Sequence, residues 1–184
     1  MGESKRLMIN IPPRHGKTEL LARFVAKSLL DKPAMNVIVA SYGQNLANSS
    51  RPFPGAVETL QALTAQGCTL GVCTNKSEPL ARVVLEALEL RQYFAVVIGG
   101  DTLATRKPDP APLLHAVRLL AGRSSDTIYV GDSEIDAATS AAAGIAFVLY
   151  TRGYRKAPVH ALAHMAHFED FGRLVDALRR PARP

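Results

Sequence analysis

The most regular feature of the chain is an alternation of apolar runs with amphipathic segments between about residues 55 and 150. A period near 3.6 residues predicts helices, whereas short continuous apolar runs bounded by Gly, Pro or polar residues predict buried strands. The predicted strands are 69–74, 94–100, 127–132 and 145–150, and the predicted helices are 56–67, 79–90, 111–122 and 134–144. This order predicts an α/β fold in which helices cover both faces of a Rossmann-like parallel sheet, in three layers.

The two ends of the chain follow less regular patterns. The first part is predicted to form a strand, a breaker-rich loop, a helix and a second strand, whose ranges are 6–11, 12–18, 19–30 and 36–41. Periodicity is then lost, and we place a junction near Ser50–Pro54, which divides the chain into a segment 1–51 and a segment 52–184. The tail is predicted to contain a short strand within 163–168 and a helix over 170–180.

The net charge of +6 is concentrated in the first segment. Residues 1–51 carry eight Lys or Arg and three Asp or Glu, whereas residues 52–184 carry fourteen and thirteen. A basic arm that binds a polyanion is one interpretation. We favour ordinary solvated charges on a segment of different origin, so nucleic-acid binding is not expected.

Hydropathy and cysteine usage favour a cytoplasmic protein. No apolar run reaches the roughly 18 residues that span a bilayer, and the first residues lack the apolar core of a secretory signal. The two cysteines, Cys68 and Cys73, do not form a C-x-x-C pair and are expected to stay reduced.

Polar side chains follow three predicted strands at the points where the strands end. Thr74 and Asn75 follow the first, Lys107 lies in a Pro-rich loop after the second, and Asp132 and Asp136 follow the third. Because carboxyl ends of parallel strands share one sheet edge, these groups are expected to gather there. Each alone is more often a helix cap or a solvated charge. Together they supply a hydroxyl, a fixed positive charge and carboxylates for Mg²⁺, which phosphoryl transfer requires.

The stretches "CTNK" (73–76), "GGDTLATRKPDPAPL" (99–113) and "VGDSEIDAATSAAAG" (130–144) resemble those of haloacid dehalogenase-like hydrolases of the phosphoglycolate phosphatase type. The resemblance covers about residues 52–184. It implies a Mg²⁺-dependent phosphomonoesterase that works through an aspartyl-phosphate on a small phosphorylated metabolite such as 2-phosphoglycolate. It also implies that Thr74 and Asn75 contact phosphate, Lys107 steadies phosphate and nucleophile, Asp132 binds the metal and Asp136 supports it. The catalytic set would be Thr74, Lys107 and Asp132.

One motif of this family is not found. The family places a D-x-D-x-T strand, with the nucleophile and the general acid/base, well before the position of Pro54, and a substrate-selecting cap domain after it. The acids before Pro54 are Glu3, Glu19 and Asp31, and none belongs to a D-x-D pair. We therefore expect a core that lacks the cap and is impaired or inactive alone. A non-catalytic module that binds phosphate and Mg²⁺ is the alternative.

The segment "PPRHGKT" (12–18) resembles the phosphate-binding loop of phage terminase large-subunit ATPases. Gly16, Lys17 and Thr18 would then bind the phosphates and Mg²⁺ of a nucleotide at a helix start. The match is partial because Ile11 occupies the first glycine position. A nucleotide-binding fragment is therefore a further alternative.

An apolar strand from the first segment could fill the sheet position of the missing motif, since an empty central position would leave backbone groups unpaired. We expect either 7–11 or 36–40 to insert between the strands 69–74 and 127–132. It stays open whether the chain forms a homo-oligomer or whether a partner chain supplies the strand. His160, His164 and His167 are interpreted as separate surface residues, because a break in structure is expected between them.

Overall fold

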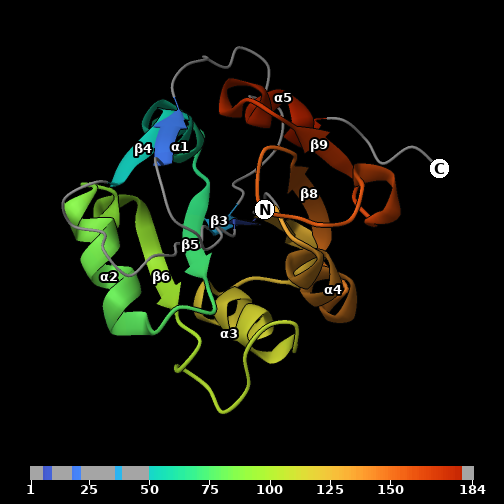
Figure 1. The fold of residues 1–184 in the computed structure, drawn as a ribbon. Helices are drawn as coiled ribbons and strands as arrows, with labels where there is room; N and C mark the ends of the chain where they lie inside the picture. The colour runs from blue at the N-terminus through green and yellow to red at the C-terminus, as the bar shows by residue number, and fades with distance from the viewer. Residues whose placement is uncertain (1–5, 10–17, 22–35, 39–49, 180–184) are drawn as a thin grey trace.

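The computed structural model describes residues 6–9, 18–21, 36–38 and 50–179. Its main sheet contains β1 (Arg6–Ile9), β3 (Asn36–Ile38), β5 (Thr69–Cys73), β6 (Phe94–Ile98), β7 (Thr127–Gly131), β8 (Ala146–Tyr150) and β9 (Ala166–Phe168). Every strand pair of this sheet within the described residues is parallel. The observed α/β architecture confirms the predicted fold class (Figure 1).

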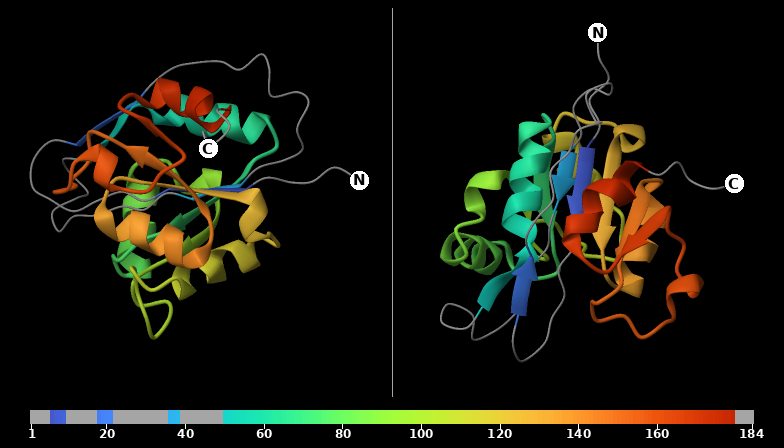
Figure 2. Two further views of the ribbon diagram at one scale, coloured as in Figure 1. Left: turned by 90° about the vertical axis from the view of Figure 1, so that its right-hand side faces the viewer. Right: turned by 90° about the horizontal axis from the view of Figure 1, so that it is seen from above.

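The helices form layers on the two faces of the sheet, as Figure 2 shows. Helices α1 (Ala56–Ala65) and α5 (Leu174–Arg179) lie on one face and α3 (Ala111–Leu119) and α4 (Glu134–Ala143) on the other, whereas α2 (Glu78–Ala87) packs against the edge strand β6. Single 3-10 turns occur at Arg91–Tyr93, Ser124–Asp126, Val159–Ala161 and Phe171–Arg173. No helix in the described ranges is long and apolar enough to cross a membrane.

Helix α4 carries the clearest local start and stop signals. The Ser133 side chain accepts a hydrogen bond from the Asp136 N–H, while the Asp136 carboxylate accepts from the Ser133 N–H, which completes a capping box. The helix ends at Gly144, whose φ of 63° is in the left-handed region that favours glycine. These signals fix where the chain leaves β7 and where it enters β8.

Alternating helices and strands bury a continuous apolar core. On α3, the spacing of Leu113, Ala116, Val117 and Leu120 directs one face of the helix inward, and all four are buried. A second group is aromatic: the rings of Phe53, Phe168 and Phe171 contact Tyr150 at centroid distances of 5.2, 5.3 and 4.8 Å. The core thus holds the strand ends in fixed relative positions.

Strand β1 lies where the sequence predicted an inserted strand. Leu7 is in register with Leu70 of β5 on one side and with Ile128 of β7 on the other. Strand β3 also pairs with both neighbours, through Asn36 with Thr69 and with Thr127. The expected insertion of an N-terminal strand between β5 and β7 is therefore confirmed.

One expectation for the first segment needs correction. Thr18–Leu21 is a strand, β2, rather than the entry into the helix predicted over 19–30; the rest of that helix lies outside the described residues. The predicted junction at 50–54 falls within β4 (Ser50–Gly55), which pairs in parallel with β2. Strand pairing between these segments depends on residues far apart in sequence, which local periodicity does not report.

Candidate active site at the carboxyl ends of the strands

The centre of the candidate site is a buried ion pair. Lys107 Nζ donates to Asp136 Oδ1 at 2.8 Å, and the two side chains are 2% and 0% exposed. Desolvation makes such a pair costly unless further hydrogen bonds satisfy both groups. A buried charge pair at the edge of a sheet is therefore weak evidence for a gain in stability and makes Lys107 and Asp136 candidates for a functional role.

Both oxygens of Asp136 are engaged. Oδ1 accepts from Lys107 Nζ and from the Tyr129 hydroxyl at 2.9 Å, while Oδ2 accepts from the N–H groups of Asp132 and Ser133 and from Ser133 Oγ at 2.6 Å. A carboxylate with this many donors is fixed in one orientation. Asp136 therefore organises the loop after β7.

Asp132 differs from Asp136, because one of its carboxylate oxygens accepts no hydrogen bond from the described residues. Oδ2 accepts from the Tyr154 N–H at 2.7 Å, but Oδ1 is buried and has no hydrogen-bond partner in the described part of the chain. Burial, followed by the charge of Asp136, raises the pKa of Asp132 to about 7. A buried carboxylate oxygen without a donor fits a hard cation, which would supply the missing positive charge.

The loop after β5 approaches the same place. Asn75 Nδ2 donates to the Lys107 carbonyl at 2.9 Å, which ties this loop to the loop that carries Lys107. Asn75 Oδ1 is also buried without a partner among the described residues. The predicted residues Asn75, Lys107 and Asp136 are thus brought together, and Thr74 is adjacent to Asn75 in the chain.

Thr74 is buried, and its backbone N–H already has a partner. It donates to the Ile98 carbonyl at 2.9 Å, so the side chain is the part of Thr74 that remains for a phosphate contact. Its Oγ1 accepts from the Lys76 N–H at 3.1 Å. The neighbouring Lys76 is buried as well, and desolvation lowers its pKa to about 8. The loop therefore places a second buried lysine after the end of β5.

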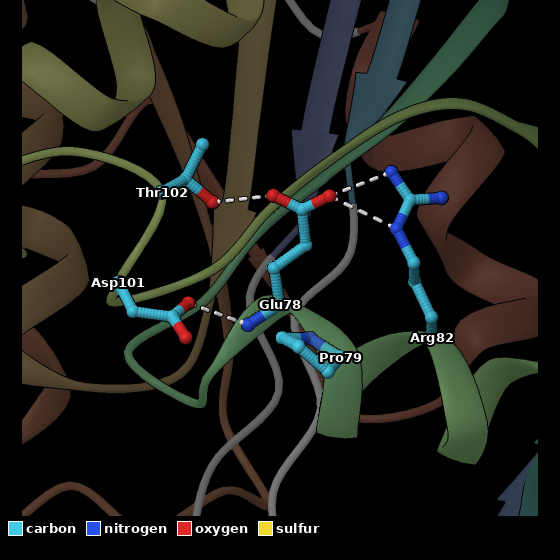
Figure 3. A pocket seen from close by; sticks show the side chains of 5 residues that line it. All are labelled: Glu78, Pro79, Arg82, Asp101 and Thr102. Atoms are coloured by element: carbon cyan, nitrogen blue, oxygen red, sulfur yellow. Dashed lines mark hydrogen bonds and ion pairs between the residues drawn. The ribbon is translucent and has the colours of Figure 1, made fainter.

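A shallow pocket of about 340 Å³ opens beside this edge, at the start of α2. Figure 3 shows Glu78 at its centre: Oε2 accepts from Thr102 Oγ1 at 2.7 Å, and Oε1 accepts from Arg82 at 2.7 and 2.9 Å. Asp101 Oδ1 accepts from the Glu78 N–H at 2.7 Å. None of the predicted site residues lines this pocket, and its polar groups satisfy one another.

Sequence reasoning missed several residues of the site. Ser133 had a recognisable signal, since Ser followed three residues later by an acid is a capping-box pattern. Tyr129 had a weaker one, because a Tyr within an apolar strand needs a partner for its hydroxyl. Gly153 had none: a Cβ on it would meet Asp132 Oδ2 at 1.9 Å, a contact that arises from folding alone.

The predicted nucleotide-binding residues and the histidines have different outcomes. Gly16 and Lys17 lie outside the described residues, and Thr18 is in β2. The interpretation of the histidines as separate residues was wrong for one pair, because His164 Nε2 lies 3.1 Å from His167 Nδ1. No group of three or more His, Cys, Asp or Glu that could hold a metal occurs within the described ranges.

Polar groups gathered at the carboxyl ends of a parallel sheet are the arrangement in which α/β proteins commonly bind a ligand. The model of the haloacid dehalogenase-like hydrolase family matches residues 13–150, and the chain belongs to this family. The match extends across the predicted junction near residue 50.

Individual relatives and a solved structure agree with this family assignment. A phosphoglycolate phosphatase of Cereibacter sphaeroides is 41% identical over 169 residues, which are 92% of this chain and 70% of the relative. One from Rhodospirillum rubrum is 45% identical over 143 residues, 78% of this chain and 59% of the relative. The crystal structure of a predicted phosphoglycolate phosphatase from Haemophilus somnus matches with a TM-score of 0.65 at 32% identity, and covers 68% of this chain and 56% of that one. The chain thus spans between 56% and 70% of the length of these relatives.

Proposed function

We propose that the strand-end site binds a small phosphomonoester such as 2-phosphoglycolate together with Mg²⁺, and that the chain alone hydrolyses it slowly or not at all. The observation that carries the proposal is the buried Asp132 Oδ1, which has no hydrogen-bond partner in the described ranges, beside the Lys107–Asp136 pair. The relatives named phosphoglycolate phosphatase support the choice of substrate.

The residues present fit a magnesium ion. Mg²⁺ commonly takes one or two protein carboxylates and completes its shell with water and phosphate oxygens. Asp132 offers an open oxygen, whereas Asp136 is occupied and would act by orienting the loop. When bound, the ion would neutralise negative charge on the phosphoryl group.

The remaining polar groups fit a phosphate. Lys107 Nζ has two hydrogen-bond partners among the described residues, Asp136 and Tyr129, and an ammonium has three N–H donors. Its remaining donor would contact a phosphoryl oxygen, and Asn75, which donates to the Lys107 carbonyl, and the adjacent Thr74 would contribute further polar groups. The site would thereby orient the ester and stabilise its charge.

A nucleophile is the missing component. The sequence contains no D-x-D pair, and the residues that follow β1, the strand between β5 and β7, read Asn-Ile-Pro-Pro. Without a carboxylate there, no aspartyl-phosphate can form at that position. Losing a nucleophile commonly lowers kcat by several orders of magnitude, about 10⁴ to 10⁶. Binding without efficient turnover is therefore the function that we propose.

The test is calorimetric titration of the chain with inorganic phosphate and with 2-phosphoglycolate, with and without Mg²⁺. We expect Mg²⁺-dependent binding that Asp132→Asn weakens at least roughly tenfold, because the open oxygen loses its charge. Asp126→Asn is the matched control, since Asp126 precedes the same strand at its opposite end. Equal affinity for phosphate in wild type and Asp132→Asn would refute the proposed site.

Turnover is measured separately as release of phosphate from 2-phosphoglycolate. We expect a rate far below the about 1 to 10³ s⁻¹ of ordinary enzymes. If the wild-type rate falls within that range and Asp132→Asn abolishes it, the proposed site is supported, but the proposal that the chain hydrolyses the ester slowly or not at all is rejected. Asp132→Asn should also fold normally, because burial already disfavours the charged carboxylate.

A further inference from the structure

A closed triangle of hydrogen bonds joins three buried side chains from three segments. The Tyr129 hydroxyl accepts from Lys107 Nζ at 2.9 Å and donates to Asp136 Oδ1 at 2.9 Å, and Lys107 donates to the same oxygen at 2.8 Å. Tyr129 and Asp136 are 0% exposed and Lys107 is 3% exposed. Tyr129 is thus the third member of the arrangement that holds the buried ammonium.

The position of the ring reinforces this contact. Lys107 Nζ lies 5.7 Å from the centroid of the Tyr129 ring, within the range of a cation–π interaction. The ring itself packs in the core and contacts Phe147 at a centroid distance of 6.0 Å. The hydroxyl is therefore carried by a rigid side chain on β7. Val130 and Gly131 follow Tyr129 and end the strand.

The geometry of these contacts determines how the Tyr129 hydroxyl affects the Lys107 ammonium. A lysine ammonium is a flexible point charge, and one partner leaves it free to rotate about its long side chain. Two partners in different directions fix the orientation of the third N–H. We propose that Tyr129 is a positioning residue that aims the remaining donor of Lys107 at the phosphoryl group. This inference rests on the proposed phosphomonoester site.

The chain offers a matched control on the neighbouring strand. Tyr150 of β8 is also buried, at 6% exposure, but it lies within the ring cluster of Phe53, Phe168 and Phe171. Its hydroxyl makes no hydrogen bond to another residue of the described ranges. Tyr150→Phe therefore removes the phenol oxygen of a buried residue without altering the contacts of Lys107, whereas Tyr129→Phe removes the phenol oxygen that contacts Lys107.

The first measurement is the affinity for inorganic phosphate with saturating Mg²⁺, by calorimetric titration of the full chain. We expect Tyr129→Phe to weaken binding roughly tenfold, the size of one lost hydrogen bond to a charged group, and Tyr150→Phe to leave it unchanged. Thermal unfolding of both variants shows whether they are folded. Unchanged phosphate affinity in folded Tyr129→Phe would overturn the proposal.

The second measurement is independent of phosphate binding. An ammonium held by two partners exchanges its hydrogens slowly, so Lys107 Nζ is expected to give a ¹⁵N–¹H signal in wild type and in Tyr150→Phe. In Tyr129→Phe the signal should broaden through exchange with water. If wild type does not bind phosphate, the proposed function fails, whereas a signal that persists in Tyr129→Phe refutes the positioning role itself.

Discussion

At the residue scale, the Asp132 carboxylate depends on close backbone approach from the loop after β8. The Tyr154 N–H donates to Asp132 Oδ2, and a Cβ on the preceding Gly153 would lie 1.9 Å from the same oxygen and 2.2 Å from Asp132 Cβ. Such distances leave no space for a side chain, and the residue affected is the proposed metal ligand. Gly153 is therefore required by contact rather than by an unusual φ.

We expect Gly153→Ala to lower the free energy of unfolding by about 1 to 3 kcal/mol and to weaken Mg²⁺-dependent phosphate binding, because the methyl group displaces Asp132. Urea denaturation and calorimetric titration measure the two effects. The control is Gly144→Ala, which has a φ of 63° but no atom within 4 Å of the added Cβ. It should cost stability through backbone strain and retain binding. Equal binding in Gly153→Ala and wild type would contradict the contact argument.

At the element scale, the start of α4 links helix stability to the site. Ser133 caps the helix and its Oγ also donates to Asp136 Oδ2 at 2.6 Å, so one residue serves the fold and the orientation of the acid. Helix α2 begins in a comparable way at the pocket of Figure 3, where Asp101 accepts from the Glu78 N–H. Both helices start in loops that follow strands of the sheet.

Ser133→Ala should lower the free energy of unfolding by about 1 kcal/mol through the lost cap. It should also weaken phosphate binding, since Asp136 loses one of its donors. Ser133→Thr keeps a hydroxyl at the cap and serves as the control in denaturant unfolding and in titration. A Ser133→Ala variant as stable as Ser133→Thr would show that the capping box contributes nothing.

The pH dependence of stability should reveal the Glu78 network. The hydrogen bond from Thr102, with help from Arg82, holds the pKa of Glu78 below its ordinary value of 4.5. Because the folded pKa is below the unfolded one, the carboxylate contributes fully above 4.5, and the contribution is lost as the pH falls through the folded pKa.

Glu78→Gln should therefore be less stable than wild type near neutral pH, and the difference should shrink toward about pH 3. Urea denaturation of both proteins at the two pH values measures it. A difference that does not change with pH would mean that the Glu78 charge has no role in this network.

At the scale of the whole molecule, strand β1 completes the sheet between β5 and β7. Met8 is in register with Gly71 on one side and Tyr129 on the other, so its backbone lies between two partners. A strand in this position satisfies backbone groups that β5 and β7 would otherwise leave unpaired. It also sets the spacing of the loops that carry Thr74 and Asp132.

Met8→Pro should destabilise the chain by about 3 kcal/mol or more, because proline removes a backbone donor and is excluded from central strands. Met8→Ala keeps the N–H and is the control for the side chain. Both are compared by cooperative unfolding in urea. If Met8→Pro unfolds at the wild-type midpoint, β1 does not contribute to the sheet.

The sequence by itself determined the succession of elements from α1 to α5 and the edge at which polar residues collect. Apolar periodicity is local, and a parallel sheet necessarily brings its carboxyl ends to one side. For this reason the sequence assigns Asn75, Lys107 and Asp136 to one place, where the structure brings them together.

Tertiary structure alone decided which further groups meet at this edge of the sheet. The Tyr129 hydroxyl and the backbone of Gly153 reach the site from β7 and from the loop after β8, and no sequence spacing encodes these contacts. The same holds for the pairing of β2 with β4 and of His164 with His167. Each depends on packing that exists only in the folded chain, which overrides local propensity because burial and hydrogen bonding are satisfied for the whole chain together.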